Sequence, residues 1–448
     1  MQKYLTVELD RGGIMDGTLA LGQTLKTAFN NILTVKDFIA EVCEGEIYKV
    51  DYNGTEKTLK WYKKTFLDSL DKKFYDNLNR TTRTREPSDK FLWPRDISEF
   101  LNGSFGYVMD PIPAGYCNMQ NLMLGKLEFK SYRTRVDTCL NIVDAFRELH
   151  NMGYSYQDLN DSSFWINPEK GKVLISDNDK VAQDGEELGI LGKPRFLAPE
   201  VVLGKTKPNT QTDLFSMAII LYIILCYNHP LEGIRYLEPA LSAELQEKIY
   251  GSEAYFMMDP DTQNPNKPSP KVHKKSIAIW NRLPNYIKQL FLNVFDQYSI
   301  KNPSYRPFEV EWLKALTRFR SEIVDCSCGN EVFTKNGESC RCEICGKKIK
   351  VPFKLVLRDY AIPAIKNSRI YRCQLGVDDN SAVAPVASIV PTKDTGELHI
   401  WNKTKDTWKA KTPSGKSKDV TPESKIPLKD GIIFTVNGQE IKIEANKN

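Results

Sequence analysis

The chain lacks any apolar run long enough to cross a membrane. Its longest such run among 448 residues is LFSMAIILYIILC, the 13 residues from Leu214 to Cys226. A membrane-spanning helix needs about 18 or more apolar residues, so this run suits a buried core helix. The first residues, MQKYLTVELDRGG, carry acidic side chains and no apolar stretch, so no signal peptide is expected. These absences predict a cytoplasmic protein with no membrane partner.

The sequence also has no excess of positive or negative charge over residues 1–350. Hydrophobic residues make up 41% and charged residues 27%, as in a soluble globular protein. The formal net charge of +5 resides in residues 351–448, where 16 Lys and Arg stand against 11 Asp and Glu. A solvated basic surface is the commoner cause of such an excess, so a nucleic-acid partner is not expected, although a nucleic-acid adaptor stays an alternative.

A cysteine pattern typical of a secreted disulfide framework is missing. Half of the ten cysteines are crowded into one segment, CSCGNEVFTKNGESCRCEICGKK. Two Cys pairs, each followed by Gly, predict the knuckles of a zinc ribbon, with a tetrahedral site made by Cys326, Cys328, Cys342 and Cys345. Cys340 is an alternative to Cys342. Four protein ligands leave no open position, so Zn²⁺ would stabilise the fold and not act in catalysis.

The spacing of apolar residues divides the chain into strand-rich and helix-rich parts. Alternation over residues 37–62, interrupted by Asn53-Gly54, predicts a β-hairpin. Helical spacing governs residues 132–151 and most of residues 201–320. Past residue 350, short runs between Gly, Pro and Asn turns predict an all-β domain. A chain of this length is expected to form about two to four domains.

Several motifs occur in the order that is typical of a protein kinase. Lys60 lies in TLKW on the third predicted strand, Asp158 lies in YSYQDLNDSS, and Asp177 lies in ISDNDK. Further along, RFLAPE contains an A-P-E triplet, and PSYRPFEVEW contains Arg306. With these motifs, the segment from about residue 37 to 320 resembles the eukaryotic-type Ser/Thr protein kinase superfamily.

Other phrases resemble a bacterial branch of that superfamily, associated with tellurite-resistance-type stress systems. They are FLWPRDI, GKPRFLAPEVV, TQTDLFS, HPLEG and MMDPDTQNPNKPSP. The resemblance implies a phosphatase and a von Willebrand A-domain protein as partners, and it accounts for D-N-D in place of D-F-G. It also implies a C-terminal forkhead-associated-like domain, although the phosphothreonine-reading residues of that family are not recognisable here.

The resemblance implies a role for each matching residue. Lys60 would hold the α- and β-phosphates of ATP, and Asp177 would bind Mg²⁺ (or Mn²⁺). Asp158 would accept the proton of the substrate hydroxyl group.

Lys60 also needs a carboxylate to orient it. The candidate is Asp76 in KFYDNL, with Asp68 and Asp71 as alternatives. The other residues expected to line the nucleotide site are Gly45, Met109 and Ser163.

Three departures from the kinase pattern count against catalysis. Where G-x-G-x-x-G is expected, Ala40 and Val42 stand at the first two glycine positions, so side chains lie where backbone should approach phosphate. Gln157 replaces the Arg beside the catalytic Asp, so switching by a phosphorylated activation loop is not expected. Ser163 replaces Asn, and its short neutral hydroxyl is a poorer ligand for a second metal ion, with Asp161 as a candidate substitute.

Together these observations predict an α+β chain with a bilobal protein kinase-like fold, then a four-cysteine zinc ribbon and a small all-β sandwich. The expected function is transfer of the ATP γ-phosphoryl group to Ser or Thr of partner proteins. The alternative is a pseudokinase scaffold that binds nucleotide without phosphoryl transfer. The expected parts are an N-terminal extension (1–36), a kinase-like N-lobe (37–110), a C-lobe (111–322), the zinc ribbon (323–350) and the forkhead-associated-like sandwich (351–448).

Overall fold

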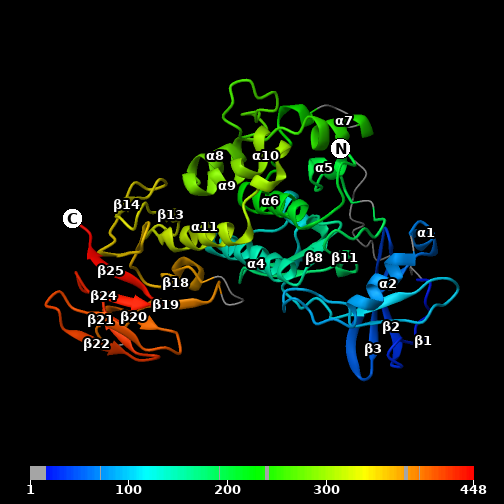
Figure 1. Ribbon diagram of the computed structural model, residues 1–448, viewed down its shortest axis with the longest axis horizontal. Helices are drawn as coiled ribbons and strands as arrows, with labels where there is room; N and C mark the ends of the chain where they lie inside the picture. The colour runs from blue at the N-terminus through cyan, green and yellow to red at the C-terminus, as the bar shows by residue number, and fades with distance from the viewer. Residues whose placement is uncertain are drawn as a thin grey trace.

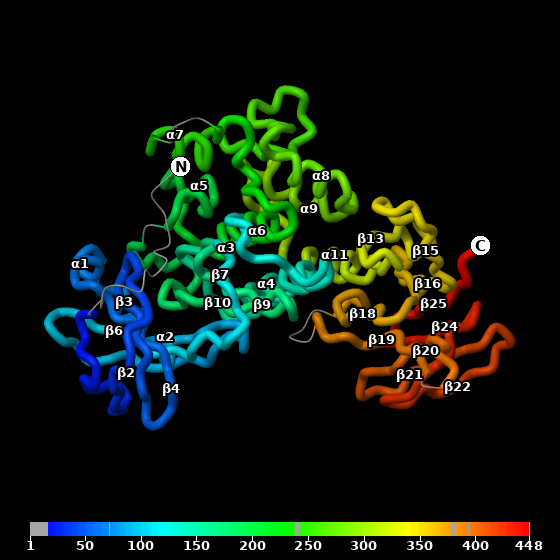
Figure 2. The backbone as a smooth tube through the Cα atoms, turned by 180° about the vertical axis from the view of Figure 1, so that it is seen from behind, coloured from blue at the N-terminus to red at the C-terminus, as the bar shows by residue number. Residues whose placement is uncertain are grey.

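The structure is a computed structural model that describes residues 17–70, 72–190, 192–237, 242–377, 382–392 and 394–447. A sheet from the N-terminal part and two sheets from the C-terminal part lie at opposite ends of the long axis, with the helices between them (Figure 1). Figure 2 shows the same order from behind. The mixture of strands and helices confirms the expected α+β class. Residues 1–16 of the expected N-terminal extension lie outside the described residues.

An antiparallel sheet of six strands forms the N-terminal part, in the order β1-β2-β3-β4-β6-β5. Its strands are β1 (Thr24–Lys26), β2 (Ile32–Val42), β3 (Gly45–Tyr52), β4 (Thr55–Tyr62), β5 (Asp96–Ile97) and β6 (Gly106–Met109). Asn53 and Gly54 have φ angles of 52° and 81° and close the β3–β4 hairpin where the sequence predicts it. The sheet begins at β1, before the expected boundary at residue 37, because Leu25 pairs with Leu33 and both side chains are buried.

Two helices follow β4, namely α1 (Lys64–Leu67) and α2 (Lys72–Thr81). The inner face of α2 carries Phe74 and Leu78, which share an apolar cluster with Tyr62 and Tyr107 of the sheet. The spacing of four residues between these two side chains places them on one face of the helix.

The middle of the chain is mainly helical, as the sequence predicts. Its helices are α3 (Gln120–Met123), α4 (Tyr132–Asn151), α5 (Pro199–Val202), α6 (Thr210–Cys226), α7 (Ala243–Glu247), α8 (Lys274–Arg282), α9 (Asn285–Phe295), α10 (Gln297–Lys301) and α11 (Glu309–Glu322), with the short turns η3 (Ile234–Leu237), η4 (Lys248–Ser252) and η5 (Pro303–Tyr305).

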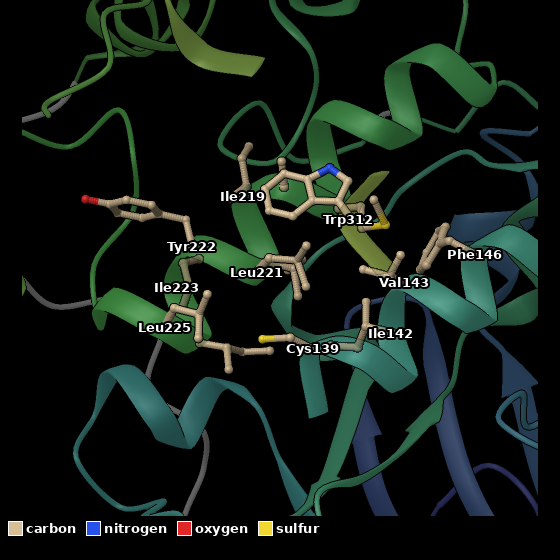
Figure 3. Packing of buried hydrophobic residues seen from close by; sticks show 14 of the residues in the cluster. Cys139, Ile142, Val143, Phe146, Ile219, Leu221, Tyr222, Ile223, Leu225 and Trp312 are labelled. Atoms are coloured by element: carbon tan, nitrogen blue, oxygen red, sulfur yellow. The ribbon is translucent and has the colours of Figure 1, made fainter. Parts of the chain in front are cut away.

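The core of this helical body is built around α6. Every side chain of α6 from Thr212 to Cys226 is buried, so this helix is covered on all sides. Figure 3 shows side chains of α4, α6 and α11 meeting in the core, among them Val143, Leu221 and Trp312. No helix in the described part of the chain is long and apolar enough to cross a membrane.

Short strands and turns carry the sequence that resembles a catalytic loop. They are β7 (Cys117–Asn118), β8 (Tyr154–Tyr156), η1 (Asp161–Ser163), β9 (Phe164–Asn167), β10 (Lys172–Ile175), η2 (Asn178–Lys180) and β11 (Val181–Gln183). β8 pairs with β11, and β9 pairs with both β10 and β7. These pairings bring the segment after β8 close to the segment after β10.

Two small hairpins and two larger sheets complete the chain. The hairpins are formed by β12 (Ile323–Asp325) with β13 (Glu331–Phe333) and by β14 (Cys340–Arg341) with β15 (Lys348–Ile349). The larger sheets have the orders β17-β16-β25-β24-β21-β22 and β18-β19-β20-β23. Their elements are β16 (Phe353–Val356), β17 (Ala361–Pro363), β18 (Arg369–Tyr371), η6 (Arg372–Leu375), β19 (Pro385–Pro391), β20 (Leu398–Asn402), β21 (Trp408–Lys411), β22 (Ser417–Val420), β23 (Lys425–Pro427), β24 (Ile433–Val436) and β25 (Gln439–Ala445).

Side chains of both larger sheets share one apolar cluster, which gives this part of the chain its own core. Leu355 and Phe434 enter it from the first sheet, and Ile389 and Ile400 from the second. Helix α11 packs against β17, β18 and η6, so the helical body and the C-terminal sheets are in direct contact.

Candidate active site

Lys60 projects from β4 toward the junction between the N-terminal sheet and the helical body. It is only 2% exposed, and its Nζ lies 2.6 Å from Glu44 Oε2, 3.0 Å from Asp177 Oδ1 and 3.1 Å from Asp179 Oδ2. Burial alone would lower the pKa of Lys60, but Asp177, Asp179 and Glu44 raise that pKa well above its usual value. Lys60 therefore carries a positive charge in this site.

The carboxylates around Lys60 differ from those expected from the sequence. Asp76 lies on the exposed side of α2, away from the buried Phe74 and Leu78. Asp68 is exposed at the end of α1. Asp71 lies outside the described residues. The partners of Lys60 come instead from the β2–β3 turn and from the D-N-D segment, so the expected Lys60–Asp76 pair is wrong.

The three residues of the D-N-D segment face different surroundings. Asp177 has a left-handed backbone conformation with φ of 57° and reaches Lys60. The amide of Asn178 donates hydrogen bonds of 2.9 Å to the carbonyls of Leu92 and Ile175, so it holds the segment against the fold.

Asp179 of η2 is buried against the N-terminal sheet, beside the Lys60 ammonium. It accepts a hydrogen bond of 2.6 Å from the Tyr62 hydroxyl and one of 3.3 Å from the Tyr107 hydroxyl. Burial raises the pKa of Asp179, and the Lys60 ammonium opposes this rise. Lys60 and Tyr62 share one face of β4, as the alternation of the strand predicts, which explains why both reach Asp179.

Asp158 lies in the turn after β8 and is buried. Its Oδ2 accepts a hydrogen bond of 2.8 Å from Lys180 Nζ, and its Oδ1 accepts one of 3.2 Å from the backbone N–H of Lys193. The backbone N–H of Tyr156 donates to Asp213 Oδ2 at 2.7 Å, so helix α6 braces the turn that carries Asp158.

Lys180 joins this group of charges to the β2–β3 turn. Its Nζ lies 2.7 Å from Glu44 Oε1. Burial alone would raise the pKa of Glu44, but the Lys60 and Lys180 ammonium groups lower that pKa to about 2. Neither Glu44 nor Lys180 was found from the sequence; the only local signals are their places beside Gly45 and directly after D-N-D.

Other residues expected near the nucleotide take mainly structural positions. Gly45 opens β3, where an added Cβ would lie 2.0 Å from the carbonyl oxygen of Trp61, so the close approach of β4 requires glycine there. Met109 ends β6 and is buried. Ser163 is fully buried in η1, and its carbonyl accepts a hydrogen bond from the backbone of Ser176.

Three ion pairs, made by Arg306 and His150, hold the helices behind the site. Arg306 contacts Glu200 of the A-P-E triplet through two contacts of 2.6 and 2.9 Å, and its guanidinium is buried. His150 of α4 lies between Asp213 and Glu309. Burial would lower the pKa of His150, but hydrogen bonds to the two carboxylates raise it to about 9.

Four cysteines converge at the two small hairpins. The sulfurs of Cys326, Cys328, Cys342 and Cys345 all lie within 4.8 Å of one another. The Cys326–Cys345 and Cys328–Cys342 sulfur distances are 3.5 and 3.7 Å. Tetrahedral Zn²⁺ with Zn–S bonds of about 2.3 Å places sulfurs about 3.8 Å apart, so these residues fit zinc. Between the alternatives left open by the sequence, the structure brings Cys342 rather than Cys340 into the group.

The middle of the chain is similar in sequence to known protein kinases. Residues 108–306 match the family described as the protein kinase domain. Protein kinase YegI of Escherichia coli O157:H7 is 26% identical over 198 residues, which cover 42% of this chain and 29% of that protein. A probable LIM domain-containing serine/threonine-protein kinase of Dictyostelium discoideum is 22% identical over 213 residues, which cover 44% of this chain and 30% of that protein. These matches support the protein kinase superfamily for the kinase-like segment.

A solved structure is also similar. The kinase domain of PknI from Mycobacterium tuberculosis has 18% sequence identity and a TM-score of 0.42, covering 66% of this chain and 98% of that chain. The first curated relatives are longer than the matched region, since the chain covers between 15% and 30% of their length.

Proposed function

We propose that the protein transfers the γ-phosphoryl group of ATP to Ser or Thr hydroxyl groups of partner proteins. The observation that carries this proposal is that one network of ion pairs joins Lys60, Asp158 and Asp177, in a chain that matches the protein kinase domain over residues 108–306. Phosphoryl transfer depends mainly on positioning and on neutralising charge, and these three side chains supply both.

In the proposed reaction each side chain has one task. Lys60 binds the α- and β-phosphates, and Asp158 accepts the proton of the substrate hydroxyl group. The hydroxyl oxygen then forms a bond to the γ-phosphorus, the bond to the bridging oxygen breaks, and its electron pair leaves with ADP. Asp177 has a partly exposed carboxylate, suited to hold Mg²⁺ (or Mn²⁺), which neutralises phosphate charge when bound.

The alternative is a pseudokinase scaffold that binds nucleotide without transfer. Ser163 favours it, because a buried hydroxyl replaces the amide that would hold a second metal ion. In that case the helical body and the C-terminal sheets would organise partners. A phosphatase and a von Willebrand A-domain protein are the partners that we propose in either case, from the resemblance to the bacterial branch.

Mass spectrometry of the intact chain after incubation with ATP and Mg²⁺ or Mn²⁺ tests the proposal. A generic protein substrate, an Asp158→Ala variant and an Asp394→Ala control, whose exposed side chain lies in the turn between β19 and β20, run in parallel. We expect phosphate on Ser or Thr with the parent and the control, and a loss of at least about a hundredfold with Asp158→Ala. Stabilisation by ATP against heat without any transfer would instead support the pseudokinase.

We also propose that the four-cysteine group binds one structural Zn²⁺. The sulfur distances fit tetrahedral coordination, and four thiolates complete the coordination of zinc. The metal would join the two hairpins, which have few apolar side chains of their own.

A further inference from the structure

The turn between β2 and β3 places the carboxylate of Glu44 in the candidate active site. Glu44 stands at the tip of this turn, directly before Gly45. Its two oxygens bind different lysines, Oε2 at 2.6 Å from Lys60 and Oε1 at 2.7 Å from Lys180. In kinases the corresponding turn covers the phosphates of ATP. In this structure the Glu44 carboxylate therefore occupies the position where phosphate oxygens of ATP are expected.

Lys180 connects Glu44 to Asp158, the proposed catalytic base. The same ammonium that binds Glu44 lies 2.8 Å from Asp158 Oδ2. Lys60, Glu44, Lys180 and Asp158 thus alternate in charge along a single chain of contacts. This chain of contacts runs from the residue that would anchor phosphates to the residue that would accept the hydroxyl proton.

We propose that Lys60 and Lys180 form a two-lysine phosphate seat, in which the Glu44 carboxylate takes the place of phosphate oxygens until a nucleotide displaces it. This proposal rests on the proposed function for the identity of the nucleotide. Both lysines are buried, and Glu44 contacts both of them, so a phosphate chain that displaces Glu44 can take its place between the two ammonium groups.

Lys180 also offers a positive charge where the second metal site is weak. Ser163 provides a short neutral hydroxyl at the position of the metal-binding amide, whereas the Lys180 ammonium lies directly beside Asp158. During transfer Lys180 keeps its proton and stabilises the negative charge of the γ-phosphoryl oxygens. It is therefore a phosphate-binding residue in addition to Lys60.

The seat can be tested with Glu44→Gln, which keeps the size of the side chain and removes its charge. The matched control is Glu41→Gln, on the same hairpin, because the exposed Glu41 pairs with the partly exposed Lys63 and not with the two lysines. Calorimetric titration with Mg²⁺ and a non-hydrolysable ATP analogue gives the affinity. We expect Glu44→Gln to bind about tenfold more tightly than the parent, as for the loss of one competing ion pair, and Glu41→Gln to match the parent.

Lys180→Met should bind the analogue at least about tenfold more weakly, and Lys180→Arg should restore most of the affinity. Circular dichroism shows whether these buried variants fold. If either one does not, the Glu44→Gln titration alone decides. Tripolyphosphate is titrated as a second probe, because it carries the phosphate chain without adenosine.

The outcomes separate this inference from the proposed function. If the parent binds and uses ATP but Glu44→Gln and Glu41→Gln bind equally, the seat is overturned and the kinase proposal stands. If no variant binds the ATP analogue but tripolyphosphate follows the expected order, the seat stands and the ATP proposal fails. If neither probe binds to any variant, both proposals are overturned.

Discussion

His150 connects three helices through its two ring nitrogens. Its Nε2 lies 3.1 Å from Asp213 of α6, and its Nδ1 contacts Glu309 of α11. Because the folded protein raises the pKa of His150 to about 9, the protonated ring stabilises the fold fully below its unfolded pKa of about 6.5. We expect this contribution, about 3 kcal/mol, to be lost as pH rises from about 6.5 through 9.

The measurement is urea unfolding of the parent and of His150→Gln at pH 6.5 and 9.5. The pKa of Asp213 is raised to about 6, so this carboxyl group loses most of its proton below this interval, whereas His150 loses its proton within it. The parent should lose more free energy of unfolding than His150→Gln between the two pH values. Equal losses in the two proteins would show that His150 is not charged in the fold.

At the scale of elements, the two cysteine hairpins should depend on metal. Each has strands of only two or three residues, and few apolar side chains pack between them. We expect the purified protein to contain about one Zn²⁺ per chain, and chelation to unfold the hairpins without unfolding the helical body. Metal analysis gives the zinc content, and hydrogen exchange of residues 323–350 gives the local order.

Cys340 and Cys342 lie two residues apart in this segment and provide a matched pair of variants. Cys342→Ser removes a sulfur of the four-cysteine group, whereas Cys340→Ser changes a cysteine outside it. Zinc should fall well below one equivalent in the first variant and stay at about one in the second. The reverse order would mean that Cys340 is the ligand, which the sequence alone left open.

At the scale of the whole molecule, Arg318 of α11 joins the helical body to the C-terminal sheets. Its guanidinium lies 4.2 Å from the ring centre of Tyr286 and 4.5 Å from that of Tyr360, and its Nε lies 2.9 Å from Glu322. Tyr286 belongs to α9, and Tyr360 to the turn between β16 and β17. We expect Arg318→Ala to lower the free energy of unfolding by about 1 to 3 kcal/mol, because both ring contacts and the ion pair are lost.

Thermal unfolding and limited proteolysis near residue 350 measure this effect. Lys418→Ala, on the exposed strand β22 and far from the interface, is the control. Arg318→Ala should melt earlier and be cleaved faster than the control. If both variants behave alike, the apolar contacts of Tyr371 and Cys373 with the helical body are sufficient to hold the two parts together.

Local patterns predicted much of the secondary structure. The turn at Asn53-Gly54 is specified by residues that adopt positive φ, and α4 has the bounds of its helical pattern, 132–151. The order of Lys60, Asp158 and Asp177 likewise anticipated three side chains that the fold brings into one site. The turn and the helix are each specified by residues that lie close together in the sequence. The three site residues each lie in a short motif whose residue types indicate their chemistry.

The pairing of charges was decided only by the tertiary structure. The sequence placed Asp76 beside Lys60 from its spacing. Instead, α2 packs against the sheet through Phe74 and Leu78, which leaves Asp76 exposed, and the D-N-D segment supplies Asp179. Glu44 and Lys180 are 136 residues apart in the chain, yet their charged groups lie 2.7 Å from each other. The sequence by itself therefore determined many of the elements, and it placed Lys60, Asp158 and Asp177 in motifs that the fold brings together. Which carboxylate meets which lysine depended on how the sheet packs against the helical body, because buried charges take the partners that packing brings within reach.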